Sequence, residues 1–208
     1  MIKGFGIELF LKRKNNRLKV WIDRTLKPFS KILTAVRISP NLVTLTGVGV
    51  TLMVPWAILQ EKWWMAGFWL LGAGFFDVLD GSLARNGGFK GSFGAFWDST
   101  MDRVSEAVVF GGFILYYYQH QNPQALLLSF GVCILSLLVS YTRARAEGLG
   151  IDCEVGVLPR PGRVILLAIG LFAGQPTAAL ALVGLLSLWT VGQRIVHVWK
   201  KTNKSQTG

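Results

Sequence analysis

Cysteine, histidine and acidic residues are all scarce in this chain of 208 residues. Its two cysteines, Cys133 and Cys153, lack the spacing of a metal-binding motif, so both are expected to be plain thiols, the first in an apolar run and the second in a loop. Its two histidines, His120 and His197, are isolated and are expected to be structural or interfacial. A zinc-type site is therefore not expected.

Charge is low overall and strongly sorted along the chain. Only 16% of the residues are charged and 51% are hydrophobic, which is typical of a membrane protein. Lys and Arg number 22 against 11 Asp and Glu, and ten of the basic residues lie within residues 1–37. Basic segments that flank apolar ones follow the positive-inside rule and contact anionic lipid headgroups. Membrane lipids are thus the expected partners of the basic segments, and nucleic acid is not.

The amino-terminal segment does not resemble a signal peptide, because residues 1–20 have no unbroken apolar core and no small-residue cleavage site. Residues 5–36 mix apolar and basic side chains, which indicates an amphipathic helix in the headgroup plane. We therefore predict a basic amphipathic juxtamembrane segment over 1–37, a membrane domain over 38–198 and a basic cytosolic tail over 199–208.

The membrane domain is predicted to be all-α, with six transmembrane helices. The apolar segments cover residues 42–59, 63–84, 94–118, 124–142, 161–174 and 176–197. A helix needs about 20 residues to cross the hydrocarbon core, and most of these segments qualify. Basic residues gather in alternate connections, which predicts a multi-pass protein of the cell membrane with both ends in the cytosol.

An acidic cluster interrupts the second and third segments. Asp77 and Asp80 are three residues apart, and Asp98 and Asp102 are four apart, so each pair shares one helix face. A short connection makes the two helices antiparallel neighbours, and their ends can present four carboxylates to one point. Such hard oxygen ligands select Mg²⁺, Mn²⁺ or Ca²⁺. Two such ions would suit phosphoryl transfer at the cytosolic end of the helices.

Small and basic residues accompany the carboxylates. Gly81 leaves room beside Asp80 for a close ligand, and Arg85, one turn later, offers a bidentate donor to phosphate. The alternative is a buried ion-pair network of the four acids with Arg85 and Arg103. Four acids against two bases make that alternative the weaker one.

Together these residues form the pattern Asp-x2-Asp-Gly-x2-Ala-Arg-x8-Gly-x3-Asp-x3-Asp over residues 77–102. This pattern resembles the signature of the CDP-alcohol phosphotransferases, and every fixed position is filled. The resemblance covers about residues 38–198. It includes Pro40-Asn41 and Thr44, which are similar to the family's entry to its first helix.

The resemblance implies that a CDP-linked lipid gives its phosphatidyl group to an alcohol, with release of CMP. It implies that Asp77, Asp80, Asp98 and Asp102 ligate two Mg²⁺ or Mn²⁺ ions, and that Asp102 is also the general base. It further implies contacts to the nucleotide and its phosphates from Asn41, Thr44, Gly81, Arg85 and Ser92. The chain departs from the family at Gly91, where relatives often carry Ser or Thr, and Ser92 is the expected substitute.

The acceptor is expected to be a phosphorylated polyol. The run Asp98-Ser-Thr-Met-Asp102-Arg103 resembles the phosphatidylinositol phosphate synthases and their archaeal counterparts, as do the ends of the fourth and sixth segments. In that branch Arg143, Arg145 and Arg194 would hold the acceptor's phosphate. Inositol 1-phosphate is the first choice and glycerol 3-phosphate the second. Family members resemble homodimers, so a homodimer is expected.

An ion transporter or channel is the alternative from another class, because acids within a membrane also mark ion pathways. Here, however, the acids gather at one end of the helices and form no trail across the membrane. The enzyme is therefore the preferred interpretation.

Overall fold

The computed structural model describes residues 39–86 and 91–206, and the regular structure within them is entirely helical. The predicted juxtamembrane helix lies outside these residues. Each of the six predicted segments corresponds to helix. The elements are α2 (Pro40–Thr51), α3 (Met53–Leu59), α4 (Trp63–Asn86), α5 (Ser92–Gln119), α6 (Pro123–Glu147), α7 (Arg160–Phe172) and α8 (Pro176–Gln206).

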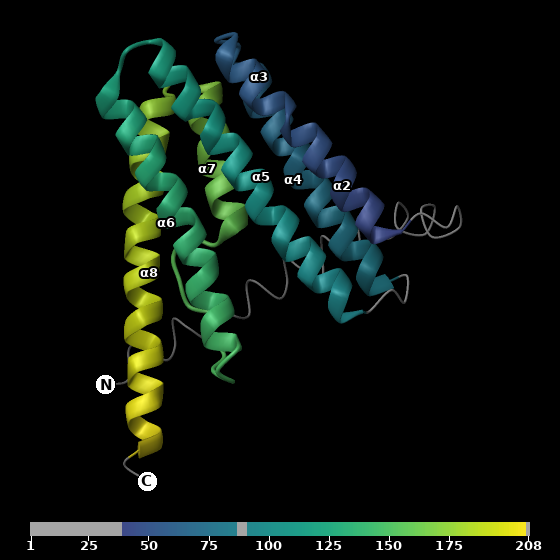
Figure 1. The fold of residues 1–208 in the computed structure, drawn as a ribbon, viewed down its shortest axis with the longest axis vertical. Coiled ribbons are helices and arrows are strands. Elements are labelled where there is room, and N and C mark those ends of the chain that lie inside the picture. Colours follow the sequence, from purple (N-terminus) through teal and green to yellow (C-terminus); the bar gives the residue numbers. More distant parts are fainter. Residues whose placement is uncertain (1–38, 87–90, 207–208) are drawn as a thin grey trace.

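Local sequence explains where the helices begin. Ser39 and Asn122 accept hydrogen bonds from backbone N–H groups three residues on, and a proline follows each as the first helical residue. α2 and α3 follow one another as one rod of 20 residues. Tight turns join the rods at one end of the bundle, where Glu61, Gln121 and Gly174 have positive φ angles. We call this the turn end (Figure 1).

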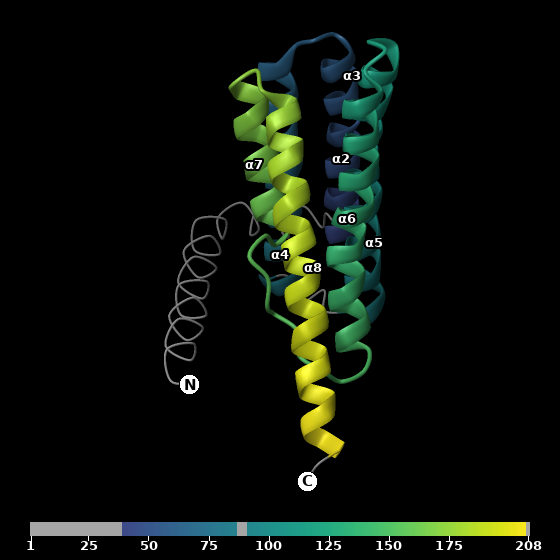
Figure 2. The same cartoon turned by 90° about the vertical axis from the view of Figure 1, so that its left-hand side faces the viewer.

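The helices form a bundle in which α7 lies between α4 and α8. α2 and α3 pack against both α4 and α5, α6 packs against α5 and α8, and α7 packs against α4 and α8 (Figures 1 and 2). The two acidic helices, α4 and α5, are predicted to be direct neighbours but are instead joined mainly through α2 and α3. The core is built from apolar side chains of all seven helices except α2, together with Leu158 of the α6–α7 connector. A separate small cluster of Val43, Leu79 and Leu83 fixes α2 against α4. That cluster positions the acidic end of α4.

Within residues 39–86 and 91–206, three rods are long and apolar enough to cross a membrane: Pro40–Leu59, Pro123–Glu147 and Pro176–Asn203. Between 28% and 44% of their most apolar windows is buried, so most of that surface faces outward. Large apolar side chains such as Leu185 and Trp189 are exposed on α8, as expected for a surface in contact with lipid. α7, with 13 residues, extends only about 20 Å.

The α6–α7 connector runs from Gly148 to Pro159 without regular structure, but it is bonded to α8. Arg194 Nε donates to the carbonyl of Val155 at 2.9 Å, and the N–H of Leu158 donates to Thr190 Oγ1 at 3.1 Å. The N–H of Val157 donates to Gln193 Oε1 at 3.2 Å. The connector thus lies along α8 and delivers the chain to the start of α7.

Candidate active site

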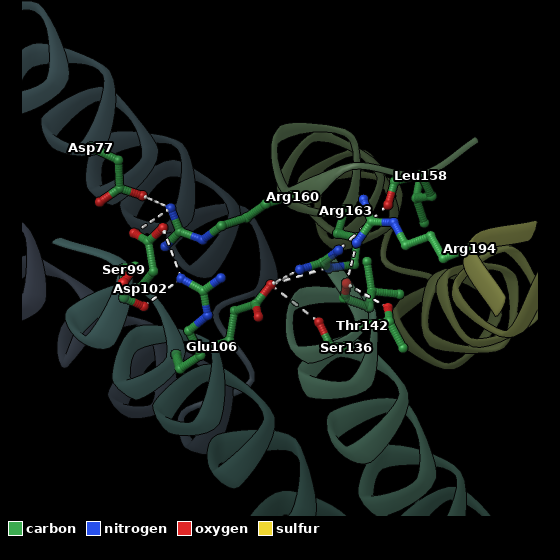
Figure 3. A network of polar contacts seen from close by, with 12 residues as sticks. Asp77, Ser99, Asp102, Glu106, Ser136, Thr142, Leu158, Arg160, Arg163 and Arg194 are labelled. Atoms are coloured by element: carbon green, nitrogen blue, oxygen red, sulfur yellow. Dashed lines mark hydrogen bonds and ion pairs between the residues drawn. The ribbon is translucent and has the colours of Figure 1, made fainter. Parts of the chain in front are cut away.

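Two of the predicted carboxylates share one arginine. Asp77 lies in the second half of α4 and Asp102 in the first half of α5, and Arg160 is the first residue of α7. Arg160 Nη1 lies 2.5 Å from Asp77 Oδ2 and 2.7 Å from Asp102 Oδ1. Figure 3 shows the guanidinium reaching between the two carboxylates. All three side chains are about one-fifth exposed, so the contact lies in a partly enclosed setting.

Asp80 is the most buried of the four, at 3% exposure. Its Oδ2 accepts a hydrogen bond of 2.6 Å from Thr44 Oγ1, while its Oδ1 is buried and has no hydrogen-bond partner. A buried carboxylate oxygen without a partner is costly. A cation bound at this oxygen would remove that cost.

Electrostatic interactions couple the four carboxylates. Asp80, Asp98 and Asp102 each interact with the charge of Asp77. Within residues 39–86 and 91–206, however, no three acid, histidine or cysteine side chains stand close enough together to hold a metal ion as they are. Arg160 lies between two of the acids instead.

The residues nevertheless fit a divalent cation. The donor set is all carboxylate oxygen, which suits Mg²⁺ and Mn²⁺. The unpartnered oxygen of Asp80 faces the same end of the bundle as the other three acids. Their role as metal ligands stays a prediction.

A groove of about 820 Å³ opens beside Asp80 and Asp98. It is lined by the starts of α2 and α5 and by the end of α4, and its lining includes all five predicted nucleotide-binding residues: Asn41, Thr44, Gly81, Arg85 and Ser92. The guanidinium of Arg85 folds over Gly81, since a Cβ atom at Gly81 would stand 3.2 Å from Arg85 Nη1. The structure thus brings these five residues together.

A second charged contact lies one turn deeper. Glu106 Oε1 accepts from Arg163 Nη2 at 2.5 Å and from Nε at 3.1 Å, and Ser136 of α6 donates to the same oxygen at 3.1 Å. Arg163 is 2% exposed and Glu106 is 8% exposed. These two residues are not among the site residues predicted from the sequence. The signal was their spacing, since Glu106 follows Asp102 by four residues and Arg163 follows Arg160 by three.

The contacts that the structure shows for the predicted acceptor arginines are to groups other than the four aspartates. Arg143 Nε bonds to Glu147 Oε1 at 2.7 Å, and Arg145 is exposed near the end of α6. Arg194 is buried and donates to the carbonyls of Val139 and Val155. Binding of an acceptor phosphate by these three residues stays a prediction.

The sequence of residues 37–199 matches the family model described as CDP-alcohol phosphatidyltransferase. The chain belongs to this family. The resemblance inferred from the aspartate motif is thereby confirmed, and with it a metal-dependent transferase as the class of enzyme.

Named relatives point to one branch of the family. The chain is 32% identical over 192 residues to the archaetidylinositol phosphate synthase of Methanothermobacter thermautotrophicus, covering 89% of this chain and 94% of the relative. It is 34% identical over 185 residues to the phosphatidylinositol phosphate synthase of Corynebacterium glutamicum, covering 84% of each.

Solved structures agree with the sequence relatives. The phosphatidylinositol phosphate synthase of Mycobacterium tuberculosis with CDP-DAG bound has a TM-score of 0.76 at 26% identity, covering 85% of this chain and 94% of that one. The same enzyme in complex with manganese and citrate has a TM-score of 0.77 at 26% identity, covering 84% and 88%. Those structures show that a relative of this fold binds a CDP-lipid and a divalent metal.

Proposed function

We propose that this protein transfers the phosphatidyl group of a CDP-linked lipid, CDP-diacylglycerol or its ether analogue, to inositol 1-phosphate and releases CMP. The groove carries this proposal, because its lining joins the five expected nucleotide-binding residues to Asp80 and Asp98. The names of the relatives support the same donor and acceptor.

The groove is suited to the pyrophosphate of the donor. The starts of α2, at Pro40, and of α5, at Ser92, both line it, and unpaired N–H groups at helix starts favour anions. Arg85 at the end of α4 adds a cation that can hydrogen-bond to phosphate oxygens. Exposed apolar side chains on the rim, Phe93 among them, would face the lipid portion.

The reaction forms one phosphorus–oxygen bond and breaks another. The acceptor's hydroxyl oxygen attacks the phosphorus that carries the diacylglycerol, the bond from that phosphorus to the oxygen of CMP breaks, and the hydroxyl proton goes to Asp102. The family pattern assigns this role to Asp102, whose carboxylate is 17% exposed and lies beside Arg160. Two divalent ions held by Asp77, Asp80, Asp98 and Asp102 would neutralise charge on the phosphates.

An acceptor that carries its own phosphate needs cations close to the reacting hydroxyl. Arg160 touches Asp77 and Asp102 directly, Arg143 and Arg145 lie near the end of α6, and Arg194 lies in the second half of α8. We assign the acceptor's phosphate to this side of the carboxylates. Glycerol 3-phosphate has the same charge, and it is the second candidate on that ground.

We further propose that six helices cross the cell membrane, with both termini in the cytosol. The end of the bundle that carries the four aspartates, which we call the acidic end, would face the cytosol too. Arginines gather at the acidic end, whereas the described turn end carries Glu61, Lys62 and His120 (Figure 1). A homodimer is the expected assembly.

The first experiment is CMP release by the purified full-length protein given CDP-diacylglycerol and Mn²⁺ or Mg²⁺. Inositol 1-phosphate, glycerol 3-phosphate, inositol and serine are offered in turn, and EDTA is the control for metal. The proposal expects release with inositol 1-phosphate and its loss with EDTA. Release with glycerol 3-phosphate alone would replace the acceptor, and EDTA-resistant release would remove the metal site.

A further inference from the structure

Two arginine–carboxylate contacts are stacked between α5 and α7. In the outer one Arg160 meets Asp102, and in the inner one Arg163 meets Glu106. Glu106 follows Asp102 by four residues and Arg163 follows Arg160 by three, so the two contacts lie one helical turn apart on each helix. Figure 3 shows Glu106 between the two groups, with Arg163 and Ser136 on its inner side.

These contacts bridge two helices that otherwise touch little. α7 packs against α4 and α8, and α5 packs against α2, α3 and α6. The direct links between α5 and α7 are therefore mainly the long side chains that cross between them. Of these, the Arg163–Glu106 contact is the better defined, because one carboxylate oxygen accepts from two nitrogens of the guanidinium and from Ser136.

The inner contact is a poor device for stability alone. Both groups are almost fully buried, and apolar residues of similar size in place of a buried ion pair are often as stable or more so. Arg163 also lies in the first turn of α7, where the helix dipole disfavours a positive charge. A role in placing other groups accounts better for this pair.

A small cavity connects the inner contact to the outer one. It has a volume of about 30 Å³ and is lined by Asp77, Glu106, Arg160 and Arg163 together with Ser105 and apolar side chains. Glu106 Oε2 and Arg160 Nε are both buried without a hydrogen-bond partner.

We propose that Glu106 and Arg163 are positioning residues that hold Arg160 between Asp77 and Asp102. Arg163 fixes the rotation and depth of α7, and Arg160, three residues earlier, is thereby aimed at the carboxylates. This inference rests on the proposed function for its acceptor readout, but the placement of Arg160 is testable without any acceptor.

The test compares four full-length proteins: wild type, Arg160→Ala, the double variant Glu106→Leu/Arg163→Met, and the triple variant. The double variant removes one positive and one negative charge, so the net charge near the aspartates is unchanged. It leaves no buried charge unpaired, and its melting temperature is expected to match or exceed that of the wild type. Ser136→Ala is the control that keeps the ion pair, and Arg163→Lys is the conservative variant for rescue.

Two readouts report on Arg160. Mn²⁺ binding is followed by electron paramagnetic resonance, and the KM for inositol 1-phosphate is separated from kcat by CMP release. Loss of Arg160 removes a cation that competes for Asp77 and Asp102, so Mn²⁺ should bind more tightly. The KM should rise by about 10- to 100-fold, because a charged hydrogen bond to the acceptor's phosphate would be lost. The double variant should likewise bind Mn²⁺ more tightly and show a higher KM for inositol 1-phosphate. Arg163→Lys keeps a positive charge beside Glu106, so it should lie between the wild type and the double variant in both readouts.

The triple variant, compared with Arg160→Ala, shows whether Glu106 and Arg163 act through Arg160. If Glu106 and Arg163 act through Arg160, the triple variant equals Arg160→Ala in both readouts. Changes that multiply in the triple variant, or a folded double variant with wild-type Mn²⁺ affinity and KM, would overturn the proposal. If the wild type releases no CMP with any acceptor, the proposed function fails while the Mn²⁺ comparison still tests the positioning pair.

Discussion

The two ends of the bundle are held together in opposite ways. At the turn end, small residues let helices touch: a Cβ atom at Gly112 would stand 2.7 Å from Pro55 Cβ, and one at Gly67 would stand 3.0 Å from Phe172. At the acidic end, the helices are linked by arginines and carboxylates around a groove and a cavity. The packed end supplies the rigidity, and the open end can therefore hold costly charges in place.

If this division is real, substitutions at the two ends should separate activity from stability. The largest effect is expected for Asp102→Asn. The amide keeps an oxygen for Arg160 but cannot take the acceptor's proton, so kcat should fall by about 10²–10⁴-fold, the usual contribution of a general base. CMP release measures this effect.

The matching acid at the turn end provides the control. Glu61→Gln should leave kcat unchanged, and both variants should keep the wild-type melting temperature. An active Asp102→Asn enzyme would remove the proposed base.

Gly112→Val should lower the stability of the protein and leave its activity unchanged. Its side chain would collide with Pro55 of α3, where the nearest atoms stand at 2.7 and 2.8 Å from the new Cβ. Overpacking of this kind costs about 1–3 kcal/mol, which thermal unfolding in detergent would show as a lower melting temperature.

The neighbouring glycine is a close control for this prediction. Gly111 has nothing within 4 Å of an added Cβ, so Gly111→Val should be mild. The folded fraction of Gly112→Val should keep wild-type kcat, and equal melting temperatures for the two variants would contradict tight packing at this crossing.

A smaller effect is expected for Arg85→Ala at the rim of the groove. Loss of a charged hydrogen bond to phosphate should raise the KM for CDP-diacylglycerol by about tenfold or more. The KM for the acceptor should stay the same, since Arg85 lines the groove on the side of α4 and α2. A variant that instead changes only the acceptor's KM would move the donor out of the groove.

The smallest effect concerns two turns at the turn end. His120 Nδ1 meets the Tyr116 carbonyl at 2.8 Å and Nε2 meets Glu61 Oε1 at 2.8 Å. The carbonyl first, and Glu61 second, raise the pKa of His120 above its usual 6.5. Because the folded-state pKa is the higher one, this contribution to stability is present below about pH 6.5 and is lost as pH rises through the folded pKa.

The wild type should therefore lose slightly more thermal stability than His120→Gln between about pH 6 and pH 8. The difference should be small, because the pair is exposed and screened by solvent. Parallel pH profiles for the two proteins would show that the pair contributes nothing.

Sequence reasoning did well where the signal was local. Apolar periodicity and the basic connections marked six segments, and each of them corresponds to helix in the structure. The family pattern also selected five nucleotide-binding residues, and all five are part of the groove lining. Bounds were less accurate: α8 continues to Gln206, nine residues beyond the predicted end.

Pairing between distant helices was not predictable in the same way. Arg160 begins α7, yet nothing near it in the sequence names Asp77 and Asp102 as its partners. Arg194 resembled a phosphate ligand, but the structure shows it bonded to two backbone carbonyls. Such contacts depend on how α7 and α8 pack, which spacing within one helix does not encode.

The connector between α6 and α7 has one more consequence. Its carbonyls and N–H groups at residues 155, 157 and 158 are bonded to side chains of α8, and Gly156 approaches so closely that a Cβ atom there would stand 2.5 Å from Thr190. This segment is therefore held firmly against α8. Any tilt of α8 within the bilayer would be carried through it to the first turn of α7, and so to Arg160. The lipid around α8 would in this way affect the position of Arg160 beside Asp77 and Asp102.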